Sequence, residues 1–186
     1  MEATETTITE DLNIPSENPI TNDFYVVGYF KLAILFSCTI GMYLPYWFYR
    51  QWKQQKSIAG VDCWPIMRGI FLIFFTHSLL ENVDKKLRLI GAVHNWNSQQ
   101  IATTFVILVF GSRVLDRFYL KGIGLPYTDL GGWLVLAIIG ILLIYIQRMI
   151  NIACNDIEGA SNRKFTAVNF LWITIGIMLL MVYLFT

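Results

Sequence analysis

The residues best suited to chemistry lie between residues 64 and 90. A helix over this stretch places a stripe of polar side chains on one face: Arg68, His77, Glu81, Asp84 and Arg88. The last four of these residues are separated by 4, 3 and 4 positions, which keeps them on one side of a helix. Histidine titrates near neutral pH, and ionisable groups at bilayer depth are costly unless they are used, so the stripe could form a proton or ion path. The alternative is a helix that emerges from the membrane with its charged end among headgroups, and the density of charge from residue 81 to residue 88 favours it.

Two further polar groups end later apolar runs. Arg113 and Asp116 share a helix face by their spacing of 3 and could pair with the stripe, because buried charges need partners. An interfacial anchor is the simpler interpretation of this pair. Arg148 and Asn151 follow the same spacing. Their hydrogen-bonding side chains could tie helices together or cap the break before Gly159, and we favour the first interpretation.

No catalytic motif accompanies these residues. The sequence lacks a phosphate-binding glycine loop, an H-E-x-x-H pair and a G-x-S-x-G turn. Its three cysteines have no spacing typical of a disulfide framework or a zinc site. We therefore predict no catalytic residue, no metal and no cofactor, and a membrane-bound enzyme is the third hypothesis for function.

Five apolar segments must position the polar residues. The chain is 55% hydrophobic and 15% aromatic, with a mean hydropathy of +0.52, which is unusual for a soluble domain of 186 residues. Segments 32–49, 130–147 and 165–186 approach the roughly 20 apolar residues that a membrane span needs. Segments 69–80 and 101–111 are about half that length. The predicted fold is an all-α polytopic integral membrane protein with five hydrophobic helices, of which three span and two are irregular or re-entrant.

Charge divides the chain into a tail and a body. Six of the thirteen acidic residues precede the first base, Lys31, so we expect residues 1–23 to form a mobile acidic tail and residues 24–186 a single basic membrane domain. Bases spread between apolar runs indicate loops beside anionic lipid rather than nucleic-acid binding. If the two short segments form a re-entrant hairpin, the bases divide ten to four, with the amino terminus outside.

Aromatic residues at the end of the first apolar segment suggest an anchor at the membrane surface. Tyrosine and tryptophan rings favour the headgroup level, and arginine favours the cytoplasmic side. The predicted anchor comprises Tyr46, Trp47, Tyr49, Arg50 and Trp52.

Two motifs carry a resemblance. YWFYRQW at Tyr46–Trp52 and PIMRGIF at Pro65–Phe71 resemble the signature of a family of small, uncharacterised bacterial inner-membrane proteins, and this likeness covers about a third of the chain. The whole chain is also similar to a group of trimeric inner-membrane proteins. The resemblance implies a multi-pass inner-membrane protein that forms homo-oligomers and supports envelope integrity or bioenergetics without catalysis. It brings no catalytic residue, and a small ion or proton channel using the polar stripe is the alternative.

Overall fold

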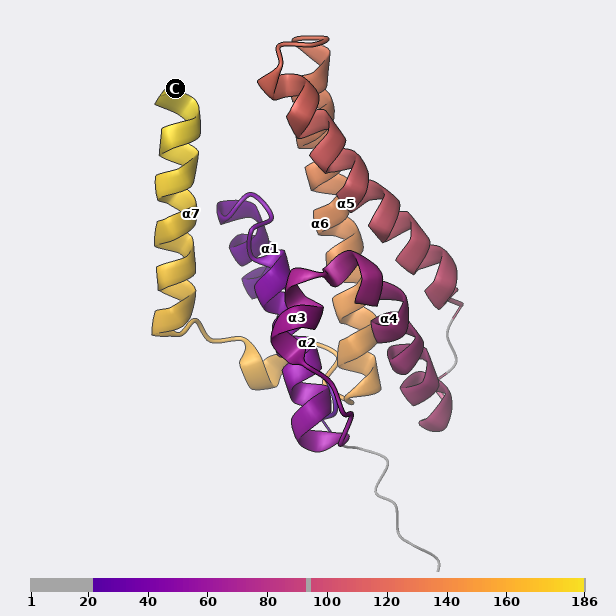
Figure 1. Ribbon diagram of the computed structural model, residues 1–186. Coiled ribbons are helices and arrows are strands. Elements are labelled where there is room, and N and C mark those ends of the chain that lie inside the picture. Colours follow the sequence, from indigo (N-terminus) through magenta and orange to yellow (C-terminus); the bar gives the residue numbers. More distant parts are fainter. Residues whose placement is uncertain (1–21, 93–94, 186) are drawn as a thin grey trace, which may run out of the picture.

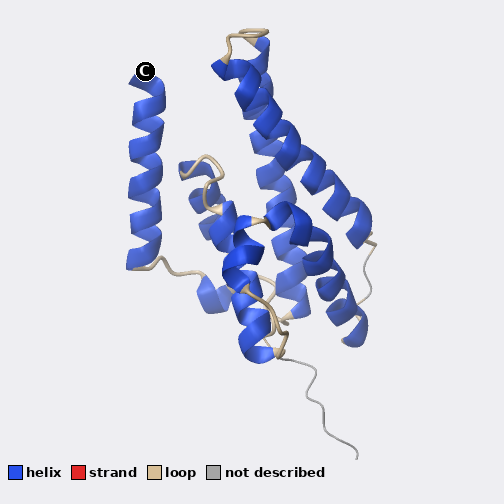
Figure 2. Cartoon of the chain, in the orientation of Figure 1, coloured by secondary structure: helices blue, strands red, loops and turns tan. Residues whose placement is uncertain are grey.

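The computed structural model describes residues 22–92 and 95–185, and within these ranges the chain is helical without any strand (Figure 2). The all-helical class predicted from the sequence is therefore confirmed for the described chain. The predicted tail lies outside these ranges except for Asn22 and Asp23. The helices are α1 (Tyr29–Cys38), α2 (Leu44–Ile58), α3 (Pro65–Ile70), α4 (Leu72–Leu89), α5 (Ser98–Leu120), α6 (Tyr127–Ala153), the short 3-10 helix η1 (Ala160–Asn162) and α7 (Ala167–Phe185).

The helices form a bundle with two distinct ends (Figure 1). At the end that we call the foot, α2, α4 and α6 terminate and the described chain begins. At the opposite end, the head, a loop joins α5 to α6 and α7 finishes. The long helices α5 and α6 pack along each other, and α1 and α4 pack on α6. Helices α2 and α3 pack on each other and on α4, and α7 packs mainly on α1.

Among the described residues, α6 is the one helix that is both long and apolar enough to cross a membrane. Its 27 residues contain the whole predicted segment 130–147. The predicted segment 165–186 corresponds to α7, which has 19 residues and no charged side chain. Apolar length alone therefore located both helices.

The first predicted span, 32–49, is wrong as a continuous helix. The chain breaks at residues 39–43 and turns back, so that α1 and α2 run in opposite directions (Figure 1). Ile40 and Gly41 have positive φ angles of 49° and 78°, which end α1, and Pro45 lies in the first turn of α2 where its missing N–H is tolerated. The Thr39 hydroxyl donates to the Leu35 carbonyl at 2.7 Å and accepts from the Tyr43 N–H at 3.0 Å, which satisfies backbone groups that the break exposes.

The two half-length segments also differ from their predicted bounds. Segment 69–80 is interrupted at Phe71, where the backbone (φ −93°, ψ 40°) separates α3 from α4. Segment 101–111 lies inside the 23-residue helix α5. This helix extends past its apolar part at both ends. The side chain of Asn97 caps its start, and Arg113 and Asp116 form an exposed ion pair in its charged last turns.

An extended segment, residues 22–28, passes through the core at the foot. Its side chains from Phe24 to Val27 are at most 7% exposed, yet no strand pairs with their backbone. Gln51 of α2 replaces a strand partner: its amide oxygen accepts from the Tyr25 N–H at 2.9 Å, and its amide nitrogen donates to the Tyr25 carbonyl at 3.0 Å. Asp23, predicted to belong to the mobile tail, forms a partly buried ion pair with Lys86 of α4 at 2.7 Å.

Three more amides complete the hydrogen bonding of this segment. Gln147 donates to the Tyr25 carbonyl at 3.1 Å, Asn162 to the Val26 carbonyl at 2.9 Å and Asn151 to the Val27 carbonyl at 3.1 Å. Asn151, predicted to tie helices together, instead joins α6 to the extended segment. We call these four residues, Gln51, Gln147, Asn151 and Asn162, the amide cluster. They satisfy backbone groups whose burial without partners would destabilise the fold.

Replacing Gln51 with leucine should destabilise the protein through this cluster. The variant leaves the Tyr25 N–H buried without its acceptor, so we expect the free energy of unfolding to fall by about 2–3 kcal/mol. Gln54, three residues along the same helix, donates only to the Asn22 carbonyl at an exposed site, and Gln54→Leu should change it by less than about 1 kcal/mol. Chemical unfolding of both variants in mild detergent measures the difference, and equal losses would contradict the role of Gln51.

Gly159 should be intolerant of any side chain. It has a φ of 64°, and an added Cβ would lie 2.5 Å from the Val27 carbonyl oxygen, on the backbone of the extended segment. Gly60 has nearly the same φ, 66°, but open space around it. We expect Gly60→Ala to lower the free energy of unfolding by about 1 kcal/mol, from backbone strain alone. Gly159→Ala should lower it by about 2 kcal/mol more than Gly60→Ala does, because the extended segment must move. Thermal unfolding of the pair tests this, and similar melting temperatures would show that the close approach is unimportant.

Candidate functional site

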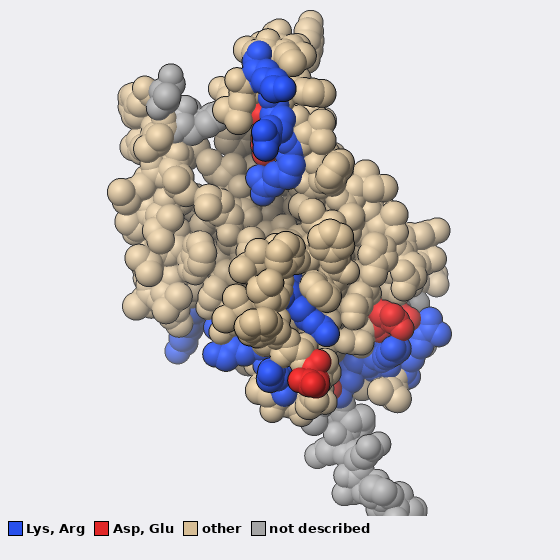
Figure 3. All heavy atoms as spheres, viewed as in Figure 1, with Lys and Arg blue, Asp and Glu red and all other residues tan. Residues whose placement is uncertain are grey.

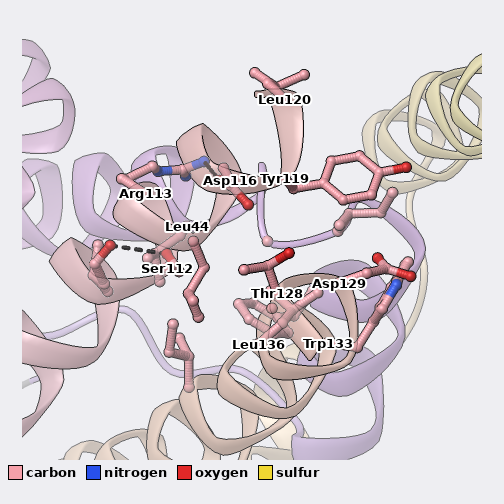
Figure 4. Close-up of a pocket in the computed structure, with 17 residues that line it drawn as sticks. Leu44, Ser112, Arg113, Asp116, Tyr119, Leu120, Thr128, Asp129, Trp133 and Leu136 are labelled. Atoms are coloured by element: carbon pink, nitrogen blue, oxygen red, sulfur yellow. Dashed lines mark hydrogen bonds and ion pairs between the residues drawn. The ribbon is translucent and has the colours of Figure 1, made fainter. Parts of the chain in front are cut away.

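A cavity of about 340 Å³ opens between α5 and α6 near the head, above the turn that joins α1 to α2 (Figure 4). Figure 4 shows side chains of α5 on one side and those of α6 on the other. We call this cavity the head cleft. Its lining comprises Phe36, Ile40, Gly41, Leu44, Val109, Ser112, Arg113, Leu115, Asp116, Tyr119, Leu120, Thr128, Asp129, Gly132, Trp133, Leu136 and Ile139.

The charged residues of the head cleft interact along α5. Arg113 pairs with Asp116 at 3.3 Å, and both side chains are more than half exposed. The two residues lie in the last turns of α5 and pair with each other rather than with the α4 stripe. The Ser112 hydroxyl donates to the Val109 carbonyl of its own helix at 2.8 Å. An exposed ion pair of this kind contributes at most about 1 kcal/mol to the free energy of unfolding. The pair therefore lies at the edge of the cleft and adds little to the stability of the fold.

The chemistry available in the head cleft favours binding. Most of the lining is aliphatic or aromatic, and the described residues around it include no histidine or cysteine. Throughout the described chain, no three His, Cys, Asp or Glu side chains gather as metal ligands would. The cleft is therefore best suited to an apolar group that packs against Leu44, Trp133 and Leu136.

The acidic residues of the α4 stripe form local ion pairs. The Asp84 carboxylate accepts from Arg88 Nε at 2.9 Å and from Trp96 Nε1 at 3.0 Å, and only 13% of its side chain is exposed. Glu81 pairs with Lys85 at 2.9 Å, and 49% of the Glu81 side chain and 64% of the Lys85 side chain are exposed. The one-turn pair predicted for Asp84 and Arg88 is confirmed, while Glu81 pairs with Lys85 instead of His77.

His77 and Arg68 point to different neighbours. His77 Nε2 lies 3.1 Å from the Thr103 hydroxyl of α5. The Arg68 guanidinium lies over the Trp52 ring, 4.1 Å from its centroid, which is a cation–π arrangement with α2. The predicted stripe thus divides between α5, α2 and the exposed face of α4, and does not converge on one point.

The prediction of an aromatic anchor at the membrane surface is wrong for its two tryptophans, because both are buried. Trp47 and Trp52 are fully buried, so they are core residues and not rings at headgroup level. Trp47 is held inside because its indole N–H donates to the Gln147 side chain at 2.7 Å. Tyr46 and Tyr49 are half-buried on the same helix.

Several functional side chains were missed or misplaced by sequence reasoning. Lys31 was counted as a loop charge but is only 2% exposed, and Gln51 was an unassigned position inside the YWFYRQW motif. A polar residue one turn from Trp47 on an otherwise buried face was the available signal for Gln51. Of the later polar pair, Asn151 is buried while Arg148 is exposed.

The two carboxylates of the stripe should differ in their effect on stability. Asp84→Asn removes a nearly buried charge that two donors contact, and we expect it to lower the free energy of unfolding by about 1–2 kcal/mol. Glu81→Gln, the matched change one turn away, should cost less than about 0.5 kcal/mol because its ion pair is exposed. Thermal unfolding in detergent distinguishes them. A larger effect at Glu81 would show that its pair with Lys85 is the structural one.

Comparison of the chain with protein-family models, with curated proteins and with solved structures finds no match. The assignment of function therefore depends on the geometry of the described residues and on the sequence patterns. The head cleft, the amide cluster and the distribution of charge are the features available for it.

Proposed function

We propose that the chain is a multi-pass protein of the bacterial inner membrane that associates with copies of itself and supports the envelope without catalysing a reaction. The observation that carries this proposal is the head cleft, an apolar cavity whose floor includes the irregular backbone of Ile40 and Gly41. Irregular backbone at membrane depth is tolerated only where protein or trapped water covers it.

The long helices support a membrane location. At about 1.5 Å per residue, α5, α6 and α7 are roughly 29–40 Å long, close to the 30 Å of a hydrocarbon core. Apolar side chains of α7 are exposed along its length, among them Phe170 at 59%, Met178 at 64% and Val182 at 64%. Such a surface is stable against lipid or another protein and unfavourable in water.

The distribution of charge supports an orientation. Figure 3 shows Lys and Arg at the foot and in a stripe near the head, with few charges on the face between them. Of the fourteen bases, Arg113, Arg117 and Lys121 lie at the head end, and the other eleven lie in α1–α4, the last turns of α6 or the α6–α7 loop. The positive-inside rule then favours a cytoplasmic foot. The described chain begins at the foot, so this orientation places residue 22 on the cytoplasmic side. The ten-to-four division of bases favours the opposite orientation, with the amino terminus outside.

The weak attachment of α7 supports self-association. It approaches the rest of the chain closely at Gly176, which lies against the backbone of Cys38, and Trp172 packs its ring edge-on against Tyr43. Towards the head, α7 stands away from α5 and α6 (Figure 1). We therefore propose that the exposed face of α7 in one copy covers the head cleft of the next copy. Such a head-to-tail contact joins two different surfaces, and it forms a closed ring when the rotation between successive copies is an integral fraction of a full turn.

The resemblance noted above supplies the size and role of this assembly. Similarity to trimeric inner-membrane proteins favours a ring of three copies and a role in envelope integrity or bioenergetics. The alternative, an ion or proton path along α4, has less support, because Glu81 and Asp84 are paired with bases and His77 faces Thr103.

Cross-linking between differently tagged copies tests the head-to-tail contact. One copy carries Val182→Cys on α7 and the other Leu120→Cys, a residue of the cleft that is 78% exposed, both in a Cys38→Ala background. We expect a short thiol-specific cross-linker to join the two tags in native membranes, and native mass spectrometry in mild detergent to show a trimer.

The matched control is Phe118→Cys, which lies near Leu120 on α5 but outside the cleft lining. It should cross-link weakly with Val182→Cys. Monomers alone in the mass spectrum would disprove self-association. Equal cross-linking at residues 118 and 120 would disprove the proposed contact and leave self-association to be explained by another surface.

A further inference from the structure

A second cavity, at the foot, gathers positive charge without acid. Its volume is about 350 Å³, and it lies between the extended segment, α1, α2 and the start of α7. We call it the basic cavity. Its lining comprises Asn22, Phe24, Tyr25, Val26, Lys31, Tyr46, Arg50, Gln54, Ser161, Asn162, Thr166, Val168 and Asn169, with no Asp or Glu among these described residues.

Lys31 supplies a buried cation to this cavity. Only 2% of the residue is exposed, and its ammonium donates to the Asn162 side-chain oxygen at 2.7 Å and to the Lys164 carbonyl at 2.8 Å. Both acceptors are neutral. An ammonium group has three N–H donors, so one donor of Lys31 remains for another acceptor. A buried charge held only by neutral groups is costly unless a counter-ion is supplied.

Arg50 supplies the second cation. Its guanidinium lies over the Tyr25 ring, 4.3 Å from the centroid, and donates to the Tyr46 hydroxyl at 3.1 Å. These contacts fix the orientation of the guanidinium but use few of its five donors. No ion pair between described residues includes Arg50 or Lys31. Two cations thus border one cavity while their counter-charge is absent from its described lining.

The neighbouring acids are engaged elsewhere. Asp23 is paired with Lys86, and the Asp156 carboxylate accepts from the backbone N–H groups of Ala160 and Ser161 at 2.8 and 2.9 Å. Asn169, which is 4% exposed, uses its side-chain oxygen to accept from Thr166, and its amide nitrogen makes no hydrogen bond within the described chain. The lining therefore offers donors from a lysine, an arginine and an amide.

We propose that the basic cavity binds a phosphate group. A phosphate carries negative charge and several acceptor oxygens, which match an arginine fork, a lysine point charge and a nearby amide. The cavity lies at the foot, where the charged residues gather, so the phosphate is that of a phospholipid headgroup or of free inorganic phosphate. It lies within one chain, so the inference holds for a monomer and for any oligomer.

Two titrations of the full-length protein, delipidated in non-ionic detergent, distinguish these sources. In one, native mass spectrometry follows adducts of phosphatidylglycerol against phosphatidylcholine. In the other, calorimetry follows inorganic phosphate against chloride at equal ionic strength. We expect saturable one-to-one binding in at least one titration: preference for phosphatidylglycerol identifies a lipid site, and a heat signal with phosphate identifies a soluble anion. No saturable binding in either titration overturns the proposal.

Arg50→Gln is the test variant, and Lys53→Gln is its control. Both remove one positive charge from α2, but Lys53 does not line the cavity. We expect Arg50→Gln to weaken binding by about tenfold or more and Lys53→Gln by less than about threefold. Arg50→Lys should restore part of the affinity, and circular dichroism confirms that each variant is folded. Equal losses at residues 50 and 53 would show general attraction to a basic surface and overturn a specific site.

Discussion

The backbone of residues 24–28 is buried and extended, and it has no strand to pair with. Its N–H and C=O groups would strongly destabilise the fold if they were left unsatisfied. Side-chain amides from α2, α6 and η1 take the place of a neighbouring strand. The foot of the bundle is organised around this requirement, since α2, α6 and the α6–α7 loop must all approach the segment to within hydrogen-bonding distance.

The sequence predicted the parts of the fold that depend on apolar length. An uninterrupted apolar run has few alternatives to a long helix, and both α6 and α7 were located in this way. The break at residues 39–43 could not be found by the same test, because a helical pair that turns back is as apolar as a helix that continues. Gly41 and Pro45 were the available signals, and neither by itself excludes a helix.

For the candidate sites, spacing along one helix succeeded and contacts between distant residues did not. The predicted pair Asp84–Arg88 follows from two residues four positions apart on one helix. Arg113 and Asp116 share a helix face as predicted, but they pair with each other and not with the stripe. The basic cavity depends on Lys31, Arg50 and Asn162, whose proximity is created only by folding. The periodicity of a single sequence does not show which distant residues come into contact. The burial of Trp47 and Trp52 could not be predicted for the same reason, because it depends on which helices pack over them.

The amide cluster also has a consequence for the order in which the protein is made. Apart from Gln51, the donors to the carbonyls of Tyr25, Val26 and Val27 lie 122, 136 and 124 residues further along the chain. During synthesis, which proceeds from the amino terminus, the extended segment emerges first, but most of its partners emerge after α5 is complete. These three hydrogen bonds therefore form only after α6 and η1 have been made, although the segment is the first part of the described chain to be synthesised.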